Sequence, residues 1–212
     1  MNNIIITISR QYGSGGRNIG KLIANKLNIN FYDKEFIEIV AKKTGMNKQY
    51  LENMEEKFTN DNLFFSAFHK EHFSSPFSGQ IKYSTLDKMF EIQSEVVKDI
   101  ANKGNCVIIG RCANFILKNT KHKCFNVFIH AHNKNRIERI KKEYGIYGVK
   151  MEEAETQLIN TDKYRSNYYK YYTGMEWGDM VNYNLTIDSG YFSDENICNI
   201  IIDAAQKKNI NT

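Results

Sequence analysis

The chain has 212 residues, of which 25% are charged and 42% hydrophobic, and a formal net charge of +5. This length suits one domain with a sizeable core, and the mild positive charge suits a protein whose ligands carry phosphates. No basic run is concentrated enough to indicate nucleic-acid binding, and no apolar stretch approaches the roughly 18 residues that span a bilayer. The amino terminus has no basic segment followed by a long apolar run, so we expect a cytoplasmic protein without a secretory signal.

The cysteines and histidines indicate neither disulfides nor a metal site. No two cysteines form a C-x-x-C pair, and no histidines lie near them at metal-ligand spacing. His69 and His72 are three residues apart, but nothing near them completes a ligand set. We therefore predict no protein-held metal and four reduced, mostly buried thiols. The cysteines are Cys106, Cys112, Cys124 and Cys198.

The first third of the chain begins with a strand, a turn and a helix. A β-branched run at 3–9 predicts a buried strand, and apolar residues at helical spacing predict a helix over 18–27. A short second strand is expected at 29–33. Helices are then expected near 36–40 and near 50–54, in a segment of different character.

The middle of the chain continues this alternation. The aromatic and polar stretch 64–77 has no clean period and predicts a mobile loop, whereas 85–104 predicts a long amphipathic helix that ends at a glycine. Buried strands are predicted at 106–110 and 124–131. A helix with apolar residues on its inner side is predicted over 134–144.

The last part contains a polar segment, a strand and a closing helix. Residues 145–182 are polar and rich in tyrosine and show no strand pattern, whereas 183–188 predicts a strand and 194–209 a helix. Strands that alternate with helices imply a parallel sheet covered on both faces. The sequence therefore predicts an α/β fold with a parallel five-stranded sheet flanked by helices.

The stretch GSGG at 13–16 follows the first strand and precedes the first helix. Glycines let backbone amides curl round a phosphate without side-chain clashes, and the helix behind them adds its partial positive charge. Glycine clusters also make ordinary turns. With a strand before and a helix after, we predict that Gly13, Ser14, Gly15 and Gly16 bind phosphate.

Two motif templates compete for this loop. The dinucleotide fingerprint G-x-G-x-x-G needs glycine at position 18, where this chain has Asn18, although Asp33 lies where a ribose-binding acid would be. The Walker pattern G-x-x-x-x-G-K-[ST] fits formally at 15–21, but Leu22 replaces the hydroxyl residue. That register also places Lys21 about one turn inside the helix, beyond the phosphates.

The segments ISRQYGSGGRNIGKLIANKLNINFYD, VIIGRCANFIL, VFIHAHNKNRIERI and DKYRSNYYKYYTG, followed by WGD and YNLTID, together resemble the cytidylate kinase-like proteins among the nucleoside monophosphate kinases. The resemblance runs along almost the whole chain. It implies a P-loop fold and phosphoryl transfer from ATP, with Mg²⁺, to a nucleoside monophosphate, CMP first. It also implies a core (1–33, 104–144 and 183–212), an acceptor-binding insertion at about 34–103 and a lid at about 145–182.

Compared with cytidylate kinases, the glycine loop of this chain lacks the usual lysine. Aligned without gaps, Gly16 replaces that lysine, Arg17 follows it and Asn18 replaces a hydroxyl residue. A one-residue insertion would instead put Arg17 in the lysine's place. In either alignment we predict that Arg17 contacts the β- and γ-phosphates, unless it is a solvated residue of the first turn. Ser14 and Asn18 are the polar groups expected to help orient Mg²⁺.

Further candidates follow the strands, where open α/β sheets bind ligands. The resemblance places Asp33 near the metal or the acceptor phosphate, with helix capping as the alternative, and begins the acceptor site at Lys34. Arg111 is expected to contact the monophosphate nucleotide, unless it makes a structural ion pair. Arg136 and Arg139 are expected to pack on the adenine or to meet ATP phosphates, and they share one helix face.

In the tyrosine-rich segment, Asp162 and Arg165 match the acceptor-contacting D-x-x-R of cytidylate kinases, with Arg165 the expected lid arginine that closes on the transferred phosphoryl group. Three departures affect acceptor recognition. Cys112 stands where cytidylate kinases have an acid, and Leu158 and Ile39 stand where they have arginines. These differences weaken the case for CMP more than the case for nucleotide binding.

Several alternatives stay open from the residues alone. The missing lysine and arginines favour a catalytically weak nucleotide-binding regulator on the same fold, or a kinase of a small acceptor that is not a nucleotide. A dinucleotide-dependent oxidoreductase is opposed by Asn18 and by the basic lid. The stretch YYKYYTGMEW at 168–177 could stack bases but is expected to pack a lid against the core. The sequence predicts no oligomeric state.

Overall fold

A computed structural model of the chain describes residues 4–33, 35–49, 51, 85–143 and 151–207. Two compact units are present, one formed by Met1–Lys34 and Val97–Thr212 and the other by Glu35–Val96. The candidate residues described below all belong to the first unit. The expected loop at 64–77, the candidate Lys34 and most of the helix expected near 50–54 lie outside the described residues.

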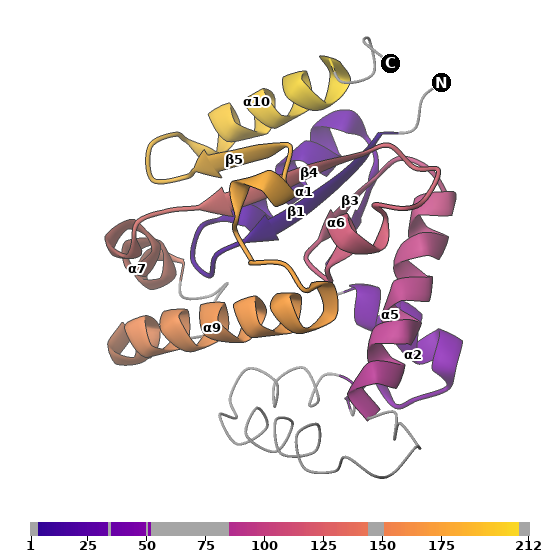
Figure 1. Cartoon of the computed structure of the whole chain (residues 1–212). Coiled ribbons are helices and arrows are strands. Elements are labelled where there is room, and N and C mark those ends of the chain that lie inside the picture. Colours follow the sequence, from indigo (N-terminus) through magenta and orange to yellow (C-terminus); the bar gives the residue numbers. More distant parts are fainter. Residues whose placement is uncertain (1–3, 34, 50, 52–84, 144–150, 208–212) are drawn as a thin grey trace. The chain divides into compact units, whose positions relative to one another are not determined.

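The first unit is built on a five-stranded parallel sheet with the order β2-β3-β1-β4-β5 (Figure 1). This confirms the predicted parallel α/β sheet. β1 is central, with β3 and β2 on one side of it and β4 and β5 on the other. Open parallel sheets bind ligands at this switch point in the strand order, at the carboxyl ends of the strands. The strands are β1 (Ile5–Arg10), β2 (Asn30–Tyr32), β3 (Cys106–Ile109), β4 (Cys124–His130) and β5 (Leu185–Asp188).

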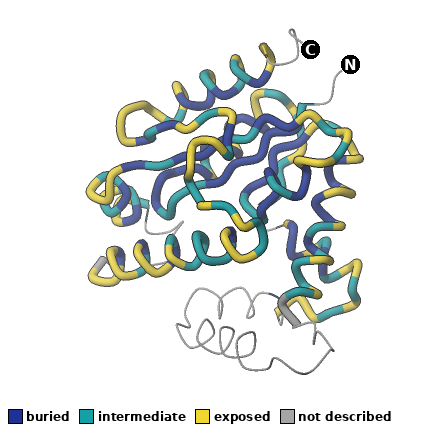
Figure 2. The backbone as a smooth tube through the Cα atoms, in the orientation of Figure 1, coloured by how far each residue is buried: buried dark blue, intermediate teal, exposed yellow. Residues whose placement is uncertain are grey.

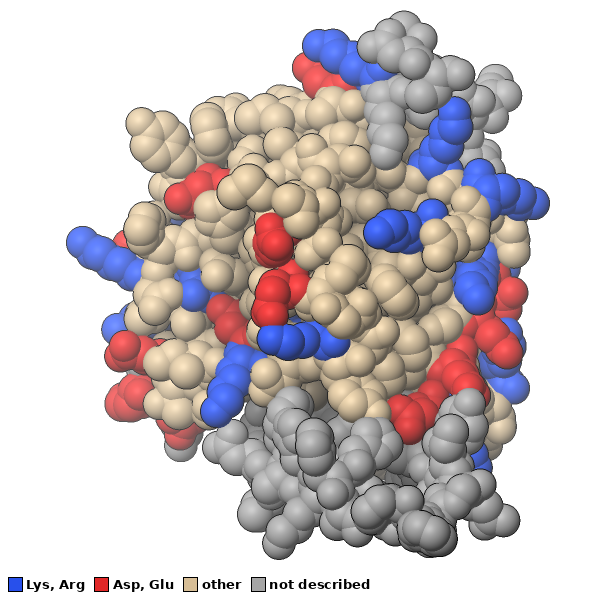
Figure 3. All heavy atoms as spheres, viewed as in Figure 1, with Lys and Arg blue, Asp and Glu red and all other residues tan. Residues whose placement is uncertain are grey.

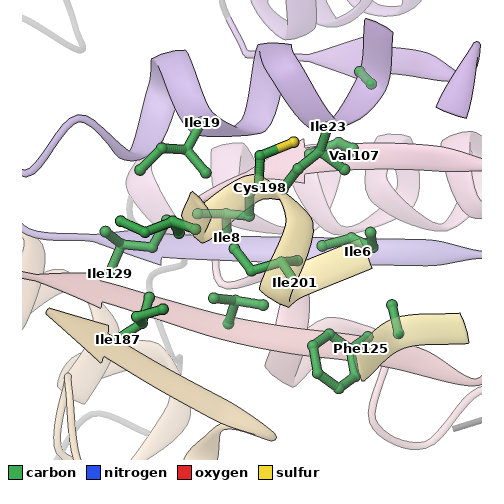
Figure 4. Close-up of a cluster of buried hydrophobic side chains, with 14 of the residues drawn as sticks. Ile6, Ile8, Ile19, Ile23, Val107, Phe125, Ile129, Ile187, Cys198 and Ile201 are labelled. Atoms are coloured by element: carbon green, nitrogen blue, oxygen red, sulfur yellow. The ribbon is translucent and has the colours of Figure 1, made fainter. Parts of the chain in front are cut away.

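One face of the sheet is covered by α1 (Gly16–Leu27) and α10 (Asp194–Lys207). Their apolar residues, which recur at helical spacing, point at the strands. Figure 4 shows Ile19 and Ile23 of α1 and Cys198 of α10 gathered above Ile8 and other aliphatic side chains of the sheet. Because all of these side chains are buried, this layer forms the main core and holds the start of α1 firmly at the end of β1.

The segments α6 (Ala113–Ile116), α7 (Asn133–Lys142) and α9 (Ala154–Thr173) complete the first unit (Figure 1). The 3₁₀ turns Met151–Glu153 and Met180–Asn182 flank α9. The sequence pattern predicts no helix at the position of α9. Its 20 residues lack a clean apolar stripe because its inner side carries polar groups, such as the buried Thr161.

The second unit contains α2 (Glu35–Thr44) and most of α5 (Thr85–Asn102), as predicted from their apolar spacing. In α2 the expected inner residues Phe36, Ile37 and Val40 are buried. A salt bridge joins Lys43 Nζ of α2 to a Glu95 carboxylate oxygen of α5 at 3.0 Å. The use of this unit as an acceptor-binding insertion stays a prediction.

Burial and charge follow the pattern of a sheet with helices packed on it. In Figure 2 the strands β1, β3 and β4 are largely buried, whereas α9 and α10 each have an exposed side. On the face shown in Figure 3, acidic and basic side chains are interspersed, and no single basic area stands out. Within the described residues, no helix is both long enough and apolar enough to cross a membrane.

Candidate active site

The glycine loop connects β1 to α1 through two left-handed residues, Gly13 (φ 75°) and Gly15 (φ 77°). Ser14 closes the turn, because its hydroxyl donates a hydrogen bond to the Gln11 carbonyl oxygen at 2.8 Å. A side chain at Gly13 would collide with the Arg136 carbonyl oxygen, 2.8 Å from a Cβ placed there. The N–H groups of the first turn of α1 have no carbonyl partner within the helix, so the loop and helix start form a geometry suited to a phosphate.

Charged groups converge beside this loop at the carboxyl ends of β1 and β2. Asp33, which directly follows β2, is buried and forms an ion pair with Arg17 Nε in the first turn of α1. Arg10, the last residue of β1, places Nη2 3.9 Å from Asp33 Oδ1. A single carboxylate therefore orients guanidinium groups from two different elements.

Arg111 is held by an unusual turn after β3. Gly110, Arg111 and Cys112 adopt positive φ angles of 68°, 59° and 53° in succession. Left-handed backbone at a residue other than glycine costs free energy, and such residues concentrate at functional sites. The positive charge of Arg111 acts on Arg10, which places both arginines in the same electrostatic environment.

Arg165 reaches the same place from the middle of α9. Its Nη1 donates a hydrogen bond to the Arg10 carbonyl oxygen at 3.0 Å, and its guanidinium carbon lies 5.7 Å from the centre of the Tyr12 ring. Burial, together with the positive charge of Arg165, lowers the pKa of Arg10 from 12.5 to about 9. We call the group Arg10, Arg17, Arg111, Arg165 and Asp33 the arginine cluster.

Arg136 and Asp162, both predicted to contact nucleotides, form an ion pair with each other, in which Arg136 is buried and Asp162 is partly exposed. Arg136 is 4% exposed, and its Nη1 also donates to the Tyr12 carbonyl oxygen at 3.1 Å. Asp162 Oδ1 accepts a hydrogen bond from the Tyr12 N–H at 2.7 Å. Both polar groups of the Tyr12 backbone are thus bound, and the pair fastens the loop to α7 and α9.

Arg139 lies on the other side of the glycine loop. Its two terminal nitrogens donate to the two Asp194 oxygens at 2.9 and 2.8 Å, and a Cβ placed on Gly15 would lie 2.5 Å from Arg139 Nη1. Asn18 Nδ2 donates to a Glu143 oxygen at 3.2 Å. Arg139, Glu143 and Asp194 border an open cavity of about 540 Å³ that extends from Gly13 to the segment after β5.

Two of the positions that depart from cytidylate kinases are used for packing here. Leu158 is 2% exposed and packs in a small apolar cluster with Ile140 and Ala154. Cys112 is buried in the left-handed turn, and burial raises the pKa of its thiol from 9.0 to about 12. An arginine or an acid would therefore need a rearranged neighbourhood at these positions. All four cysteines are buried, and none of them is in a disulfide.

Arg10 was not predicted from the sequence as a site residue. The available signal was its place, directly before the glycine loop at the end of a strand, where ligand-binding residues of parallel sheets concentrate. Its neighbours Asp33, Arg111 and Arg165 are far away in the sequence. Only the strand order and the packing of α9 bring them together.

Solved structures similar to this chain define the class of fold. An uncharacterized protein from Eubacterium ventriosum superposes with a TM-score of 0.67 at 24% identity, covering 96% of this chain and 98% of that one. Shikimate kinase from Acinetobacter baumannii, solved with shikimate, gives a TM-score of 0.52 at 13% identity over 98% and 95% of the two chains. The fold is that of the P-loop kinases, in agreement with the strand–glycine loop–helix geometry.

The sequence comparisons then identify the family. The model of the cytidylate kinase-like family matches residues 5–191, and the chain belongs to that family. The cytidylate kinase of Methanocaldococcus jannaschii is 29% identical over 203 residues, which are 95% of this chain and 97% of that protein. The cytidylate kinase of Pyrococcus horikoshii is 30% identical over 163 residues, 74% of this chain and 79% of that protein. The chain is thus a phosphotransferase of the nucleoside monophosphate kinase type.

Proposed function

We propose that this protein transfers the γ-phosphoryl group of ATP to a nucleoside monophosphate, with CMP the first candidate. The convergence of the arginine cluster beside the glycine loop supports this proposal most strongly. Phosphoryl transfer needs little covalent chemistry from the protein, and its rate depends on positioning and on positive charge around the moving group. The names of the related proteins support CMP as the acceptor.

The donor ATP would lie across the loop. Its phosphates meet the N–H groups of Gly15, Gly16 and the rest of the first turn of α1. Its base enters the cavity of about 540 Å³ beside Arg139, whose guanidinium is held in place by two hydrogen bonds to the Asp194 carboxylate. This assignment gives Arg139 the adenine-packing role expected from the sequence. Arg136 and Asp162 support the site by holding Tyr12.

Transfer would occur at the arginine cluster. A phosphate oxygen of the acceptor forms a bond to the γ-phosphorus, the bond from that phosphorus to the bridging oxygen breaks, and the leaving charge stays on ADP. Arg17 and Arg165 neutralise the oxygens of the moving group, and Arg111 holds the acceptor phosphate. In the family's chemistry Lys34 would begin the acceptor site.

Magnesium would enter with ATP. Mg²⁺ is commonly bound through substrate phosphates and only one or two carboxylates, and the rest of its shell is water. Asp33 meets this need, because its buried carboxylate lies at the mouth of the loop. Among the described residues, no group of three or more His, Cys, Asp or Glu side chains could hold a metal. A metal carried by the phosphates needs no such group. We also propose a cytoplasmic location, because the four cysteines are buried and none of them is in a disulfide.

A panel of acceptors tests the proposal. ATP and Mg²⁺ are incubated with CMP, dCMP, UMP, AMP or GMP, or with small hydroxyl compounds, and ADP release is measured beside ATP binding by calorimetry. We expect one pyrimidine monophosphate to be preferred. ATP binding without transfer to any acceptor would favour a regulatory nucleotide-binding protein, and transfer only to a hydroxyl compound would move the acceptor outside the nucleotides.

A further inference from the structure

In the alignment without gaps, Gly16 stands where P-loop kinases carry their lysine, and its lack of a side chain has a local cause. Gly16 begins α1 with helical backbone, so its conformation does not demand glycine. A Cβ placed there would lie 2.6 Å from Arg10 Cβ and 3.0 Å from Arg10 Cγ. The next neighbour, Ile129 Cβ, is 3.7 Å away, an ordinary contact. The Arg10 side chain therefore occupies the space into which a lysine at position 16 would begin.

From that point the Arg10 side chain runs along the carboxyl edge of the sheet. It passes from β1 over Gly110 after β3, where an added Cβ would overlap Arg10 Nη1. It ends 3.9 Å from Asp33, the residue after β2. The side chain is 21% exposed, so most of it is enclosed. The Arg10 stem thus requires glycine at position 16, and Gly110 leaves room for its guanidinium.

The charges around Arg10 leave it suited to an anion. Four charged groups act on it, of which the arginines at 17, 111 and 165 repel its charge and only Asp33 favours it. A cation surrounded mainly by cations is stabilised when a polyanion binds. The oxygens of a polyphosphate at the glycine loop would supply that charge.

We infer that Arg10 takes the place of the missing loop lysine and contacts the β- and γ-phosphates of ATP from the end of β1. This inference rests on the proposed donor site. In P-loops the lysine reaches these phosphates from the helix, as a compact point charge. Here a planar guanidinium arrives from the strand and can bind two oxygens at once. The cation can then come from a lysine at position 16 or from an arginine at position 10. Long side chains at both positions would clash.

The exchange can be made by mutation. Arg10→Gln removes the charge and keeps much of the stem, Gly16→Lys adds the lysine against the existing arginine, and the double variant Arg10→Gly with Gly16→Lys restores the P-loop arrangement. Lys21→Ala, which changes an exposed lysine further along α1, is the matched control. Each variant is titrated with inorganic tripolyphosphate and with ATP by calorimetry, and kcat is measured with the preferred acceptor.

We expect Arg10→Gln to weaken tripolyphosphate and ATP binding by about 10- to 100-fold and to lower kcat by at least about 100-fold. Gly16→Lys alone should lose binding through the clash with Arg10. The double variant should recover to within about tenfold of the wild type, and Lys21→Ala should match the wild type. The emission of Trp177, the single tryptophan, checks that each variant is folded.

Two results would overturn the inference. One is an Arg10→Gln variant that binds tripolyphosphate as tightly as the wild type. The other is a Gly16→Lys variant with wild-type stability and affinity, which would mean that the space is not occupied. The proposed function fails separately: a wild type that binds tripolyphosphate through Arg10 but phosphorylates no acceptor would leave Arg10 as the phosphate ligand of a protein that is not a kinase.

Discussion

Replacing Asp162 by alanine removes the carboxylate that fastens the Tyr12 backbone and neutralises Arg136. The Arg136 side chain is only 5% exposed, and the Asp162 side chain 17%. Arg136 would keep its hydrogen bonds to the Tyr12 carbonyl oxygen at 3.1 Å and to Asn133 Oδ1 at 2.6 Å, but its charge would have lost its carboxylate. The substitution therefore leaves an uncompensated cation in a buried place.

The expected loss of stability follows from these contacts. Removing one partner of a buried ion pair costs about 3–5 kcal/mol. We take about 3 kcal/mol, the lower end, because Asp162 keeps some exposure and Arg136 keeps two hydrogen bonds. For a chain of this length that corresponds to a fall in Tm of about 6–12 °C. Asp162→Asn keeps an acceptor for the Tyr12 N–H, so its loss should be about 1 kcal/mol smaller.

Urea denaturation followed by Trp177 emission measures this loss, because the Trp177 ring packs edge-on against Phe128 at 5.2 Å between centroids in the same unit. Asp203→Ala, at an exposed acid of α10, is the control. The double variant Asp162→Leu with Arg136→Met removes both charges. Its loss of unfolding free energy should be at least about 1.5 kcal/mol smaller than the summed losses of the single variants Asp162→Leu and Arg136→Met.

A structural role for Asp162 would be refuted by a simple result. If Asp162→Ala unfolds at the same urea concentration as the wild type while KM for the acceptor rises, Asp162 contacts the substrate, as the resemblance to cytidylate kinases predicts. Strictly additive effects in the double variant would also refute the reasoning, because the two charges would then not depend on each other.

The remaining predictions concern two arginines and the cysteines. Arg165→Ala should lower kcat at least about 100-fold and change ATP affinity only a few-fold, with little recovery in Arg165→Lys, whereas an unchanged kcat would remove Arg165 from the transferred group. Arg17→Ala should weaken ATP binding by about 1.5–3 kcal/mol in calorimetry, and unchanged affinity would exclude a phosphate contact. Thiol titration of the denatured, unreduced protein should count four, and two or none would contradict the free thiols. In the native protein Cys106 and Cys112 should react slowly with a thiol reagent at pH 8, because burial raises the pKa of each thiol to about 12. The folded pKa of these thiols is thus above the unfolded pKa near 9. The two buried thiols therefore contribute fully to the free energy of unfolding below about pH 9, and this contribution is lost as the pH rises towards 12.

Strands β1 and β3 could be predicted because each is a short, β-branched run that is buried almost throughout. The run at 106–110, for example, became β3 at Cys106–Ile109, with all four residues buried. The helix α9 could not be predicted in this way. Tertiary contacts use its polar residues, Asp162 toward Tyr12 and Arg165 toward Arg10, so the apolar period that marks a helix is absent.

The candidate site was predictable to the extent that its chemistry is local. Glycines between a strand and a helix make a phosphate loop because their conformational freedom and the helix start lie within a few residues of each other. Asp33 and Arg17 were both identifiable from their places at an element's end or beginning. Their ion pair was not, since it depends on the strand order, in which β3 separates β2 from β1.

The sequence by itself therefore determined the parallel α/β fold, the glycine loop and the absence of a lysine at the start of its helix. Only the tertiary structure decided what stands in that place. The Arg10 side chain excludes a side chain from Gly16, and Asp33, Arg111 and Arg165 reach it from other elements. The direction of a side chain at the end of a strand depends on its neighbours in the sheet. The strand order sets those neighbours, and no local pattern of residues records that order.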